Sequence, residues 1–289
     1  MSKVLVTGSA GFIGSHLVDG LVTLGHTVTG IDNLSSGVEE NVNPNMLFLK
    51  KDIRDDMAEF DFEYVFHLAA VPRVQYSVEY PKETHYNNVD GTLNILEHCR
   101  KNKIKKIIFA SSSSVYGDQL LPFKEDMQAN PKSPYSLQKR IGEEYMKLYD
   151  ELYDVPTISL RFFNVYGSRC RNDSEYSLVI GKFLKMKREG KPLTIFGDGN
   201  QTRDFTHVSS VVDACIKAMN CSIHNEIINI ANCKGTSINE IAEMIGGERK
   251  YLPPRLGDVL HTLGDNSKAK KLLNWVPSNI TIKEKLNEM

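Results

Sequence analysis

The chain has 289 residues, of which 41% are hydrophobic and 25% charged, and its formal net charge is −1 at pH 7. This length suits one large domain with a lobe, or two domains. The near-neutral charge gives no basis for binding nucleic acid or an anionic membrane, and no apolar run approaches the roughly 20 residues of a membrane-spanning helix. We therefore expect a soluble protein.

The cysteines indicate a reducing compartment. They are odd in number, scattered, and form no Cys-x-x-Cys pair: Cys99, Cys170, Cys215, Cys221 and Cys233. That pattern argues against a disulfide framework or a zinc site. Lys3 to Thr7 already read as a strand, so we expect no signal peptide. The sequence predicts a cytoplasmic protein without a bound metal.

A glycine-rich turn lies between the first expected strand and the first expected helix. Val4 to Thr7 form the apolar strand, and Leu17, Leu21 and Leu24 follow at helical spacing. The turn between them supplies Gly8, Gly11, Phe12, Ile13 and Gly14. Glycines allow a tight turn and close backbone approach, and a pyrophosphate can sit at the helix N-terminus. The arrangement predicts a dinucleotide site.

The second expected strand, Thr27 to Asp32, ends in an acid downstream of Gly14. An acid there accepts hydrogen bonds from the adenosine ribose hydroxyls and repels a 2′-phosphate. Asn33 to Gly37 contain no arginine that could receive such a phosphate. We therefore predict NAD rather than NADP. The alternative is that Asp32 is a plain strand-end carboxylate.

Two further strands lead toward the same cleft. The third, Met46 to Leu49, ends near Asp52 and Ile53, which are placed to reach the adenine. The fourth, Tyr64 to Ala70, ends in small residues that let the backbone approach a cofactor. Its histidine, His67, is expected to be a structural group.

A helix is expected from about Tyr86 to Lys101, followed by a strand, Lys106 to Ala110, and by the serine run Ser111 to Ser114. The basic run 101–106 reads as a solvated connection. Alternating strands and helices predict a Rossmann-type, doubly wound parallel sheet with ligands at the carboxyl ends of its strands. The serine run lies at such an end, which favours a site over a polar turn.

Tyr135 and Lys139 lie four residues apart in a helical stretch and therefore share one face. Such a pair can turn a phenol into a base. With twelve tyrosines and about one lysine per twelve residues, roughly one such pair is expected by chance. Its interpretation depends on the other motifs.

Taken together, these residues resemble the extended short-chain dehydrogenase/reductase family, and within it the NAD-dependent nucleotide-sugar 4-epimerases. The resemblance covers nearly the whole chain. It rests on motifs in one order: Thr7-Gly8-x-x-Gly11-Phe12-Ile13-Gly14, Asp32, Ser111 to Gly117, Tyr135-x-x-x-Lys139, Arg161 to Gly167, Gly197 to Val208, and Pro254-Arg255-x-Gly257-Asp258.

The resemblance implies a role for each site residue. Tyr135 is the base, Lys139 supports it and binds the nicotinamide ribose, and Ser112 hydrogen-bonds the reacting oxygen, with Ser113 as the fallback. The implied cofactor contacts are Gly8, Gly11, Phe12, Ile13, Gly14, Asp32, Asn33, Ser36, Gly37, Asp52, Ile53, Leu68, Ala69, Ala70, Asn87, Tyr135, Lys139 and Phe162. The implied substrate contacts are Ser112, Ser113, Asn164, Val179, Arg203, Arg255, Asp258 and Thr262, with both arginines on the diphosphate of a UDP-sugar.

The implied reaction inverts C4 of a UDP-hexose. The base takes the proton of the C4 hydroxyl while the C4 hydride passes to NAD, and the hydride returns to the other face of the flat 4-keto intermediate. A free tyrosine titrates near 10, so lowering its pKa by about 3 units requires roughly 4 kcal/mol of preference for the phenolate. Lys139 and the positive nicotinamide ring are the expected sources.

Ser113 and Ser114 stand where dehydrating relatives carry an Asp-Glu pair and decarboxylating relatives usually a Glu. Serine cannot act as a carboxylic acid or base at neutral pH, which favours 4-epimerisation. Thr262 leaves room for a 2-N-acetyl group, so UDP-GlcNAc/UDP-GalNAc is expected beside UDP-Glc/UDP-Gal. UDP-glucuronate 4-epimerisation is the nearest alternative, against which Asn164 counts modestly. A nucleotide-sugar lyase and a non-catalytic NAD-sensing protein stay open.

The expected domains interleave in sequence. Residues 1–165 form the NAD-binding domain, to which 203–231 return, and residues 166–202 and 232–289 form a smaller substrate-binding lobe. The resemblance implies a homodimer through the helices after His85 and Tyr135, where Leu137, Ile141, Leu148 and Leu152 look exposed. A simple core face would give the same pattern. Relatives usually continue through another helix, so the resemblance leads us to expect a trimmed C-terminal edge at Met289.

Overall fold

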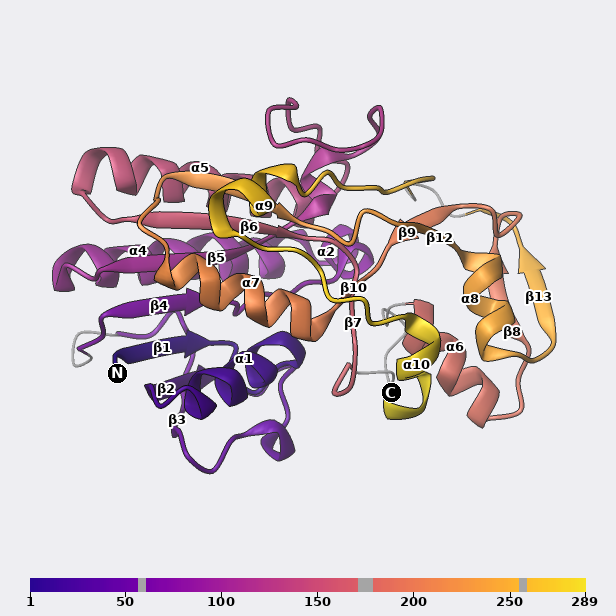
Figure 1. The fold of residues 1–289 in the computed structure, drawn as a ribbon, viewed down its shortest axis with the longest axis horizontal. Helices are drawn as coiled ribbons and strands as arrows, with labels where there is room; N and C mark the ends of the chain where they lie inside the picture. The colour runs from indigo at the N-terminus through magenta and orange to yellow at the C-terminus, as the bar shows by residue number, and fades with distance from the viewer. Residues whose placement is uncertain (57–60, 171–178, 255–258) are drawn as a thin grey trace.

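The computed structural model describes residues 1–56, 61–170, 179–254 and 259–289 (Figure 1). Its centre is a seven-stranded sheet in the order β11-β6-β5-β4-β1-β2-β3, in which every pair is parallel. The strands are β1 (Lys3–Thr7), β2 (Thr27–Asp32), β3 (Leu47–Lys50), β4 (Tyr64–His67), β5 (Lys106–Ser112), β6 (Thr157–Phe162) and β11 (Glu226–Ile230). The predicted doubly wound α/β fold is confirmed.

Helices cover both faces of the sheet (Figure 1). One face packs against α1 (Phe12–Thr23), α7 (Val208–Asn220) and α9 (Ser267–Leu273), and the other against α4 (Gly91–Asn102) and α5 (Pro134–Tyr153). The central strands are buried on both sides, which explains their continuous apolar runs. The carboxyl ends of the strands therefore meet at one edge.

The segment before α4 differs from the single helix expected from Tyr86. A short helix, α3 (Pro81–His85), continues into a π-helical turn over Tyr86–Asp90 and then into α4. Asn88 in this turn is buried, and its side-chain amide bonds the backbone of Val71 and the side chain of Gln138 on α5. The turn fixes α2 (Val74–Glu79) and α3 beside α5, through contacts that a local helical period does not reveal.

Lys106 contradicts the expectation of a wholly solvated basic run. Lys101, Lys103 and Lys105 are exposed, but Lys106 at the start of β5 is buried. Its Nζ donates to the carbonyl oxygens of Ala218, at 3.1 Å, and Cys221, at 2.5 Å, at the C-terminal end of α7. A cation is favoured there because the last carbonyl groups of a helix lack partners within it. The prediction was wrong because this contact links residues more than a hundred positions apart.

A second, smaller group of elements packs around its own core beyond the sheet (Figure 1). It contains α6 (Val179–Arg188), β8 (Leu193–Phe196), α8 (Ile238–Ile245), β13 (Arg249–Leu252) and α10 (Ile282–Lys285). Two-stranded ladders join it to the sheet: β7 (Val165–Tyr166) with β10 (Thr206–His207), and β9 (Thr202–Asp204) with β12 (Gly235–Ser237). In the sequence between β13 and α10, residues 267–275 leave this group and pack on the sheet. The division into domains stays a prediction.

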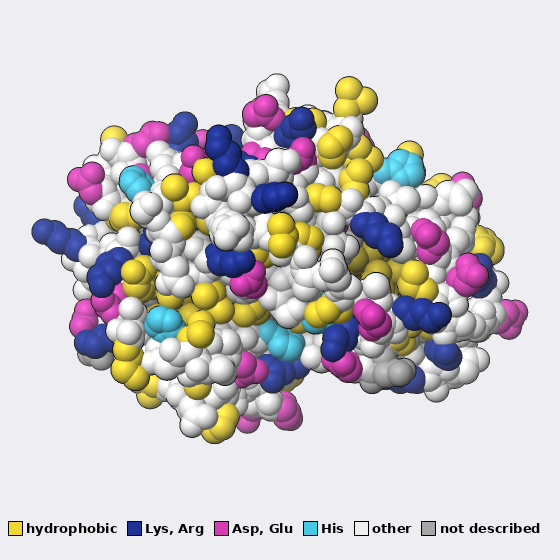
Figure 2. Space-filling view, viewed as in Figure 1, with side chains coloured by type: hydrophobic (Ala, Val, Ile, Leu, Met, Phe, Trp, Pro, Cys, Tyr) yellow, Lys and Arg dark blue, Asp and Glu magenta, His cyan; other side chains and the backbone are white. Residues whose placement is uncertain are grey.

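The molecular surface carries mixed charge. Figure 2 shows Lys and Arg side chains interspersed with Asp and Glu over the face that it displays. Among the described residues, no helix is both long and apolar enough to cross a membrane.

Candidate active site

A cavity of about 590 Å³ opens at the carboxyl ends of the parallel strands. Its walls come from the turn after β1, the ends of β2, β4, β5 and β6, and the start of α5. Most of the predicted site residues line it: Gly8, Gly11, Phe12, Ile13, Gly14, Asp32, Asn33, Ser36, Ile53, Leu68, Ala69, Ala70, Asn87, Ser112, Ser113, Tyr135, Lys139, Phe162, Asn164, Arg203 and Thr262. The structure thus brings together residues more than 250 positions apart.

The glycine-rich turn leaves no room for a side chain at Gly8 or Gly14. A Cβ on Gly14 would lie 2.0 Å from the carbonyl oxygen of Gly8. Gly8 itself has a φ of +72°, and a Cβ there would lie 2.8 Å from the amide nitrogen of Ala69. The tight turn begins α1 directly at the cavity, where the unpaired amide groups of a first helical turn favour an anion. This is the cradle that a pyrophosphate requires.

Asp32 lies at the end of β2, almost wholly buried. Its carboxylate accepts hydrogen bonds from the amide groups of Ala10, at 3.1 Å, and Leu34, at 2.8 Å. Burial nevertheless raises its pKa, and these two bonds oppose that rise. A carboxylate with two lone-pair positions satisfied by the backbone keeps others for ribose hydroxyl groups.

Three predicted contacts do not line the cavity. Asp52 bonds Arg54 and Asn33 instead, which lowers the pKa of Asp52 to about 2. Gly37 packs on Asp32, where a Cβ would lie 2.8 Å from the carboxylate, and Val179 begins α6 beside the core of the smaller lobe. Two more predicted residues, Arg255 and Asp258, lie outside the described residues. The roles assigned to these five stay predictions.

The start of α5 places Tyr135. Ser133 is the N-cap and accepts a hydrogen bond from the amide of Ser136, at 3.2 Å, and Pro134 occupies the first helical turn. The amide of Tyr135, which has no partner within the helix, donates to Oγ of the buried Ser77 on α2, at 3.0 Å. Both contacts fix the helix end from which Tyr135 enters the cavity.

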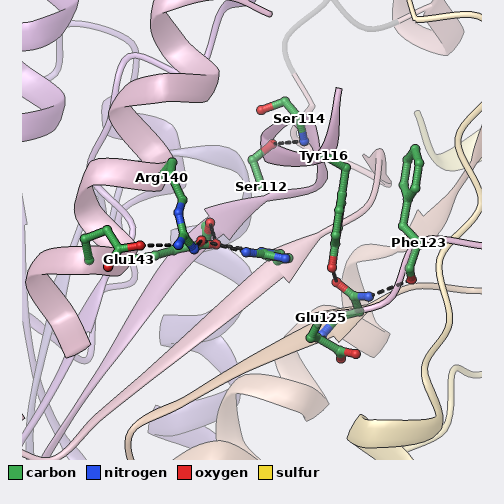
Figure 3. Close-up of polar contacts among 11 residues, drawn as sticks. Ser112, Ser114, Tyr116, Phe123, Glu125, Arg140 and Glu143 are labelled. Atoms are coloured by element: carbon green, nitrogen blue, oxygen red, sulfur yellow. Dashed lines mark hydrogen bonds and ion pairs between the residues drawn. The ribbon is translucent and has the colours of Figure 1, made fainter. Parts of the chain in front are cut away.

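Tyr135, Lys139 and Ser112 meet at the end of β5. The Ser112 side chain lies close enough to the Tyr135 hydroxyl to lower the pKa of that tyrosine. Nζ of Lys139 donates to the carbonyl oxygen of Ala110, at 2.8 Å, and lies 4.7 Å from the centre of the Phe109 ring. Oγ of Ser112 also accepts from the amide of Ser114, at 3.2 Å (Figure 3). The predicted trio is therefore assembled by one strand and one helix.

The protein environment alone favours the neutral forms of both titratable groups. Burial raises the pKa of Tyr135 to about 12, and the neighbouring Ser112 side chain opposes that rise. Burial lowers the pKa of Lys139 to about 7, and the nearby Glu143 carboxylate opposes that fall. The expected lowering of the tyrosine pKa by Lys139 is not produced by the protein groups alone.

The predicted substrate contacts that line the cavity are connected by hydrogen bonds. Nδ2 of Asn164 donates to the carbonyl oxygen of Asp204, at 3.1 Å, and to Oγ1 of Thr262, at 3.3 Å. Nη1 of Arg203 donates to the carbonyl oxygens of Thr202, at 2.9 Å, and Leu260, at 3.2 Å. These contacts hold an amide, a guanidinium and a hydroxyl group at one wall of the cavity.

His67 is the structural group that the sequence predicted. Its ring nitrogens lie 2.8 Å from Oγ1 of Thr7 and 2.9 Å from Oγ1 of Thr92, and the side chain is fully buried. Burial lowers its pKa to about 3, so the ring is neutral at physiological pH.

The sequence did not identify several lining residues, among them Lys51, Arg73, Lys132 and Cys170. One signal was available, since Lys132 immediately precedes the Ser133-Pro134 pair that begins α5. The other three lie in loops that carry no recognised pattern, and their positions depend on how distant strands meet.

The fold and the site define a class. A doubly wound parallel sheet, a glycine-rich first turn, an acid ending β2 and a buried Tyr-x-x-x-Lys pair beside a serine are the features of an NAD-dependent short-chain dehydrogenase/reductase. The residues present fit the cofactor, because the glycine cradle suits its pyrophosphate and Asp32 suits an unphosphorylated adenosine ribose. The model of the NAD dependent epimerase/dehydratase family matches residues 4–231, and the chain belongs to this family.

Relatives and solved structures agree with this membership. The chain is 45% identical to a putative UDP-glucose 4-epimerase of Methanocaldococcus jannaschii, over 97% of this chain and 95% of that one. Its structure matches a UDP-N-acetylglucosamine 4-epimerase of Methanobrevibacter ruminantium in complex with UDP-N-acetylmuramic acid, with a TM-score of 0.95, 40% identity, and coverage of 99% and 96%. It also matches a UDP-glucuronic acid 4-epimerase of Bacillus cereus in complex with UDP-glucuronic acid and NAD, with a TM-score of 0.92, 34% identity, and coverage of 99% and 97%.

Proposed function

We propose that the protein is an NAD-dependent UDP-sugar 4-epimerase, which inverts C4 of a UDP-hexose through a transient 4-keto intermediate. The observation that carries the proposal is the assembly of Tyr135, Lys139 and Ser112 at one end of the NAD-type cavity. The names of the relatives support it, since all three that are compared above carry a 4-epimerase name.

The cofactor would be held by residues from two strand ends and from α5. The turn from Gly8 to Gly14 cradles the pyrophosphate, Asp32 accepts from the adenosine ribose, and Lys139 donates to the nicotinamide ribose. Bound NAD supplies a reversible acceptor for the hydrogen on C4 of the sugar. The remaining cofactor contacts that we propose are Phe12, Ile13, Asn33, Ser36, Gly37, Asp52, Ile53, Leu68, Ala69, Ala70, Asn87 and Phe162.

The protein side chains manage the proton. Tyr135 takes the proton of the C4 hydroxyl and later returns it, and Ser112 donates a hydrogen bond to the oxygen as its charge develops. Ser113 and Ser114 follow Ser112 at the cavity wall. Neither can act as a carboxylic acid or base at neutral pH, so elimination of water lacks a catalyst at these positions.

The substrate contacts that we propose are those implied by the sequence motifs. Arg203 and Arg255 would take the diphosphate, Asp258 a ribose hydroxyl, and Asn164, Ser113 and Val179 the remainder of the UDP-sugar. Thr262 is hydrogen-bonded to Asn164 and presents only a small side chain to the cavity. A small residue there is compatible with a 2-N-acetyl group, so we propose that UDP-GlcNAc/UDP-GalNAc is accepted beside UDP-Glc/UDP-Gal.

UDP-glucuronate 4-epimerisation is the second candidate. The observation in its favour is that Arg73 and Lys132 line the cavity in addition to Arg203, and a uronate carries a carboxylate that cations attract. We further propose a cytoplasmic homodimer that contacts its copy through α4 and α5.

The test is to incubate the purified protein with UDP-Glc, UDP-GlcNAc and UDP-GlcA in separate reactions and to follow the C4 configuration by proton NMR. We expect UDP-Glc or UDP-GlcNAc to equilibrate with its C4 epimer. Conversion of UDP-GlcA alone would select the second candidate, and conversion of none of the three would overturn the proposal.

A further inference from the structure

A buried ion pair lies one helical turn beyond Lys139. Glu143 on α5 and Arg161 on β6 are each 1% exposed. The Arg161 guanidinium donates two hydrogen bonds to the Glu143 carboxylate, from Nε to Oε1 at 2.7 Å and from Nη2 to Oε2 at 2.8 Å. A two-bond fork of this kind allows only one relative orientation of its partners.

The carboxylate of Glu143 also joins α5 to the strand that carries Ser112. Oγ of Ser111, the residue before Ser112, donates to Oε1 of Glu143 at 2.6 Å. Nη1 of Arg140 donates to Oε2 at 3.1 Å, and Figure 3 shows Arg140 and Glu143 extending from the same helix toward the end of β5. One carboxylate thus connects α5, β5 and β6.

The network continues on the far side of Arg161. Its guanidinium lies 4.6 Å from the centre of the Tyr116 ring, and the Tyr116 hydroxyl donates to Oδ1 of Asn229 on β11, at 2.7 Å. Nδ2 of Asn229 donates to the carbonyl oxygen of Phe123, at 3.0 Å (Figure 3). The ion pair is therefore anchored to the strand and the loop beyond β6.

Net stability does not explain such a pair. Removing two charges from water costs several kcal/mol per ion, and a well-packed apolar pair of similar volume is often as stable or more so. What the pair contributes instead is a fixed geometry. Ser111, which donates to the carboxylate, directly precedes Ser112, and Glu143 itself lies one helical turn after Lys139.

We propose that Glu143 and Arg161 are a positioning pair for catalysis, which holds α5 against the ends of β5 and β6 so that Tyr135 stays aligned with Ser112. The inference rests on the proposed 4-epimerase activity. Glu143 lies outside the cavity lining, so it is not placed to touch substrate or cofactor. It acts through Ser111 and through the charge that it presents to Lys139.

The charges around Lys139 give the pair a second consequence. Glu143 and Arg140 are on the same helix as Lys139, and Arg161 reaches the Glu143 carboxylate from β6. His67 on β4 is neutral. Without the carboxylate, the two guanidinium groups would disfavour the ammonium form of Lys139. A less charged Lys139 stabilises the Tyr135 phenolate less, so the acidic limb of the pH–rate profile moves to higher pH.

The first test compares Glu143→Gln with Glu151→Gln, a matched substitution at an exposed position of the same helix. We expect Glu143→Gln to lower kcat by about 10- to 100-fold, because small misalignments of reacting groups cost that much. The KM for the UDP-sugar and the amount of bound NAD stay unchanged, and the acidic limb moves to higher pH. Glu151→Gln behaves as the parent. Unchanged kcat and pH profile in Glu143→Gln overturn the proposal.

A charge-free variant separates positioning from folding. The double substitution Glu143→Leu and Arg161→Met leaves no charge of the pair buried without a partner, so it is compatible with a stable fold. We expect it to fold and to lose kcat as Glu143→Gln does, whereas parent kcat in the folded double variant overturns the proposal. If both charge variants fail to fold, Ser111→Ala provides the test, because it removes the hydrogen bond to Glu143. A reduced kcat at unchanged KM supports the positioning role of the pair, and a parent kcat contradicts it.

A readout without turnover keeps this inference separate from the proposed function. The phenolate absorbance of Tyr135, taken as the difference from a Tyr135→Phe protein, reports its titration in the NAD-bound enzyme. We expect this titration at higher pH in Glu143→Gln than in the parent, and an equal titration in both overturns the pair. If the parent converts no UDP-sugar, the proposed function fails while this titration still decides on the pair.

Discussion

Tyr135 is a weak base in its protein environment, because burial raises its pKa to about 12. Lowering that pKa to neutrality corresponds to roughly 7 kcal/mol of preference for the phenolate. Lys139 in its charged form and the positive ring of bound NAD are the cations available for this. The base is therefore expected to become active only with the cofactor in place.

The first prediction concerns the hydroxyl group of Tyr135. Tyr135→Phe should lower kcat by about 100-fold or more, because it removes the group that transfers the proton. Tyr153→Phe, at an exposed position of the same helix, serves as the control. Both proteins should keep the parent content of NAD, measured after denaturation. Full activity of Tyr135→Phe would exclude the mechanism.

The second prediction concerns the cost of burying Lys139. Its pKa is about 7 in the folded protein against an ordinary value of 10.5. Below pH 7 both states bind the proton and the fold carries the full cost; between pH 7 and 10.5 the cost falls, and above 10.5 it vanishes. In protein stripped of cofactor, Lys139→Met should therefore be more stable than the parent by roughly 2–4 kcal/mol at pH 7, although inactive.

Urea unfolding at pH 7 and pH 9 measures this difference. The gap in unfolding free energy between Lys139→Met and the parent should shrink at pH 9, since the folded lysine has then lost its proton. A gap that is the same at both values would show that packing, and not charge, sets the stability of this position.

At the scale of elements, α5 is the part on which the site depends. It carries Tyr135 and Lys139, and its start is fixed by Ser133 and by Ser77 of α2. The sequence predicted the pair on one helical face, but the partner of the Tyr135 amide lies 58 positions away in sequence. Such long-range contacts decide whether a motif is aligned, and a local pattern does not contain them.

The third prediction tests that contact. Ser77→Ala removes the acceptor of the Tyr135 amide and should destabilise the protein by about 1–3 kcal/mol, since a buried donor is left unpaired. It should also lower kcat several-fold, because the start of α5 loses a constraint. Ser237→Ala removes the N-cap of α8 in the lobe at a comparable cost of about 1 kcal/mol, and should leave kcat unchanged. Equal effects of both on kcat would argue against positioning by Ser77.

The sequence predicted best where function depends on a local turn. The turn from Gly8 to Gly14 and the acid Asp32 could be placed because strand, turn and helix are contiguous. Lys106 was misplaced because its partners belong to the end of α7. The partnership of Glu143 with Arg161 could not be found for the same reason, since the two meet only when α5 packs on β6.

At the scale of the whole molecule, the cavity is lined both by the ends of the central strands and by residues next to the smaller lobe. The strand ends of the sheet carry the predicted cofactor contacts, and Asn164, Arg203 and Thr262 form the wall nearer the lobe. Asp204 links these parts, because its carboxylate accepts from the amide groups of Asn232, Cys233 and Gly264. The wall is thus built on a buried junction and not on a free loop.

The fourth prediction concerns assembly. Leu137, Leu148 and Leu152 are exposed on α5, while Ile141 is half-buried. A second copy of the chain would cover these side chains, as we propose for the homodimer. Sedimentation velocity should show a dimer for the parent and a monomer for the combined variant Leu148→Lys and Leu152→Lys. A monomeric parent would contradict the proposed dimer and leave the chemistry untouched.

The central claim is that C4 is oxidised and then reduced by the same hydrogen, so that no net redox occurs. The most direct measurement follows UDP-glucose that carries deuterium at C4, in ordinary water, by NMR and mass spectrometry. We predict that the C4 epimer forms with its deuterium fully retained at C4. Loss of deuterium to water, or loss of water or carbon dioxide from the sugar, would contradict the account.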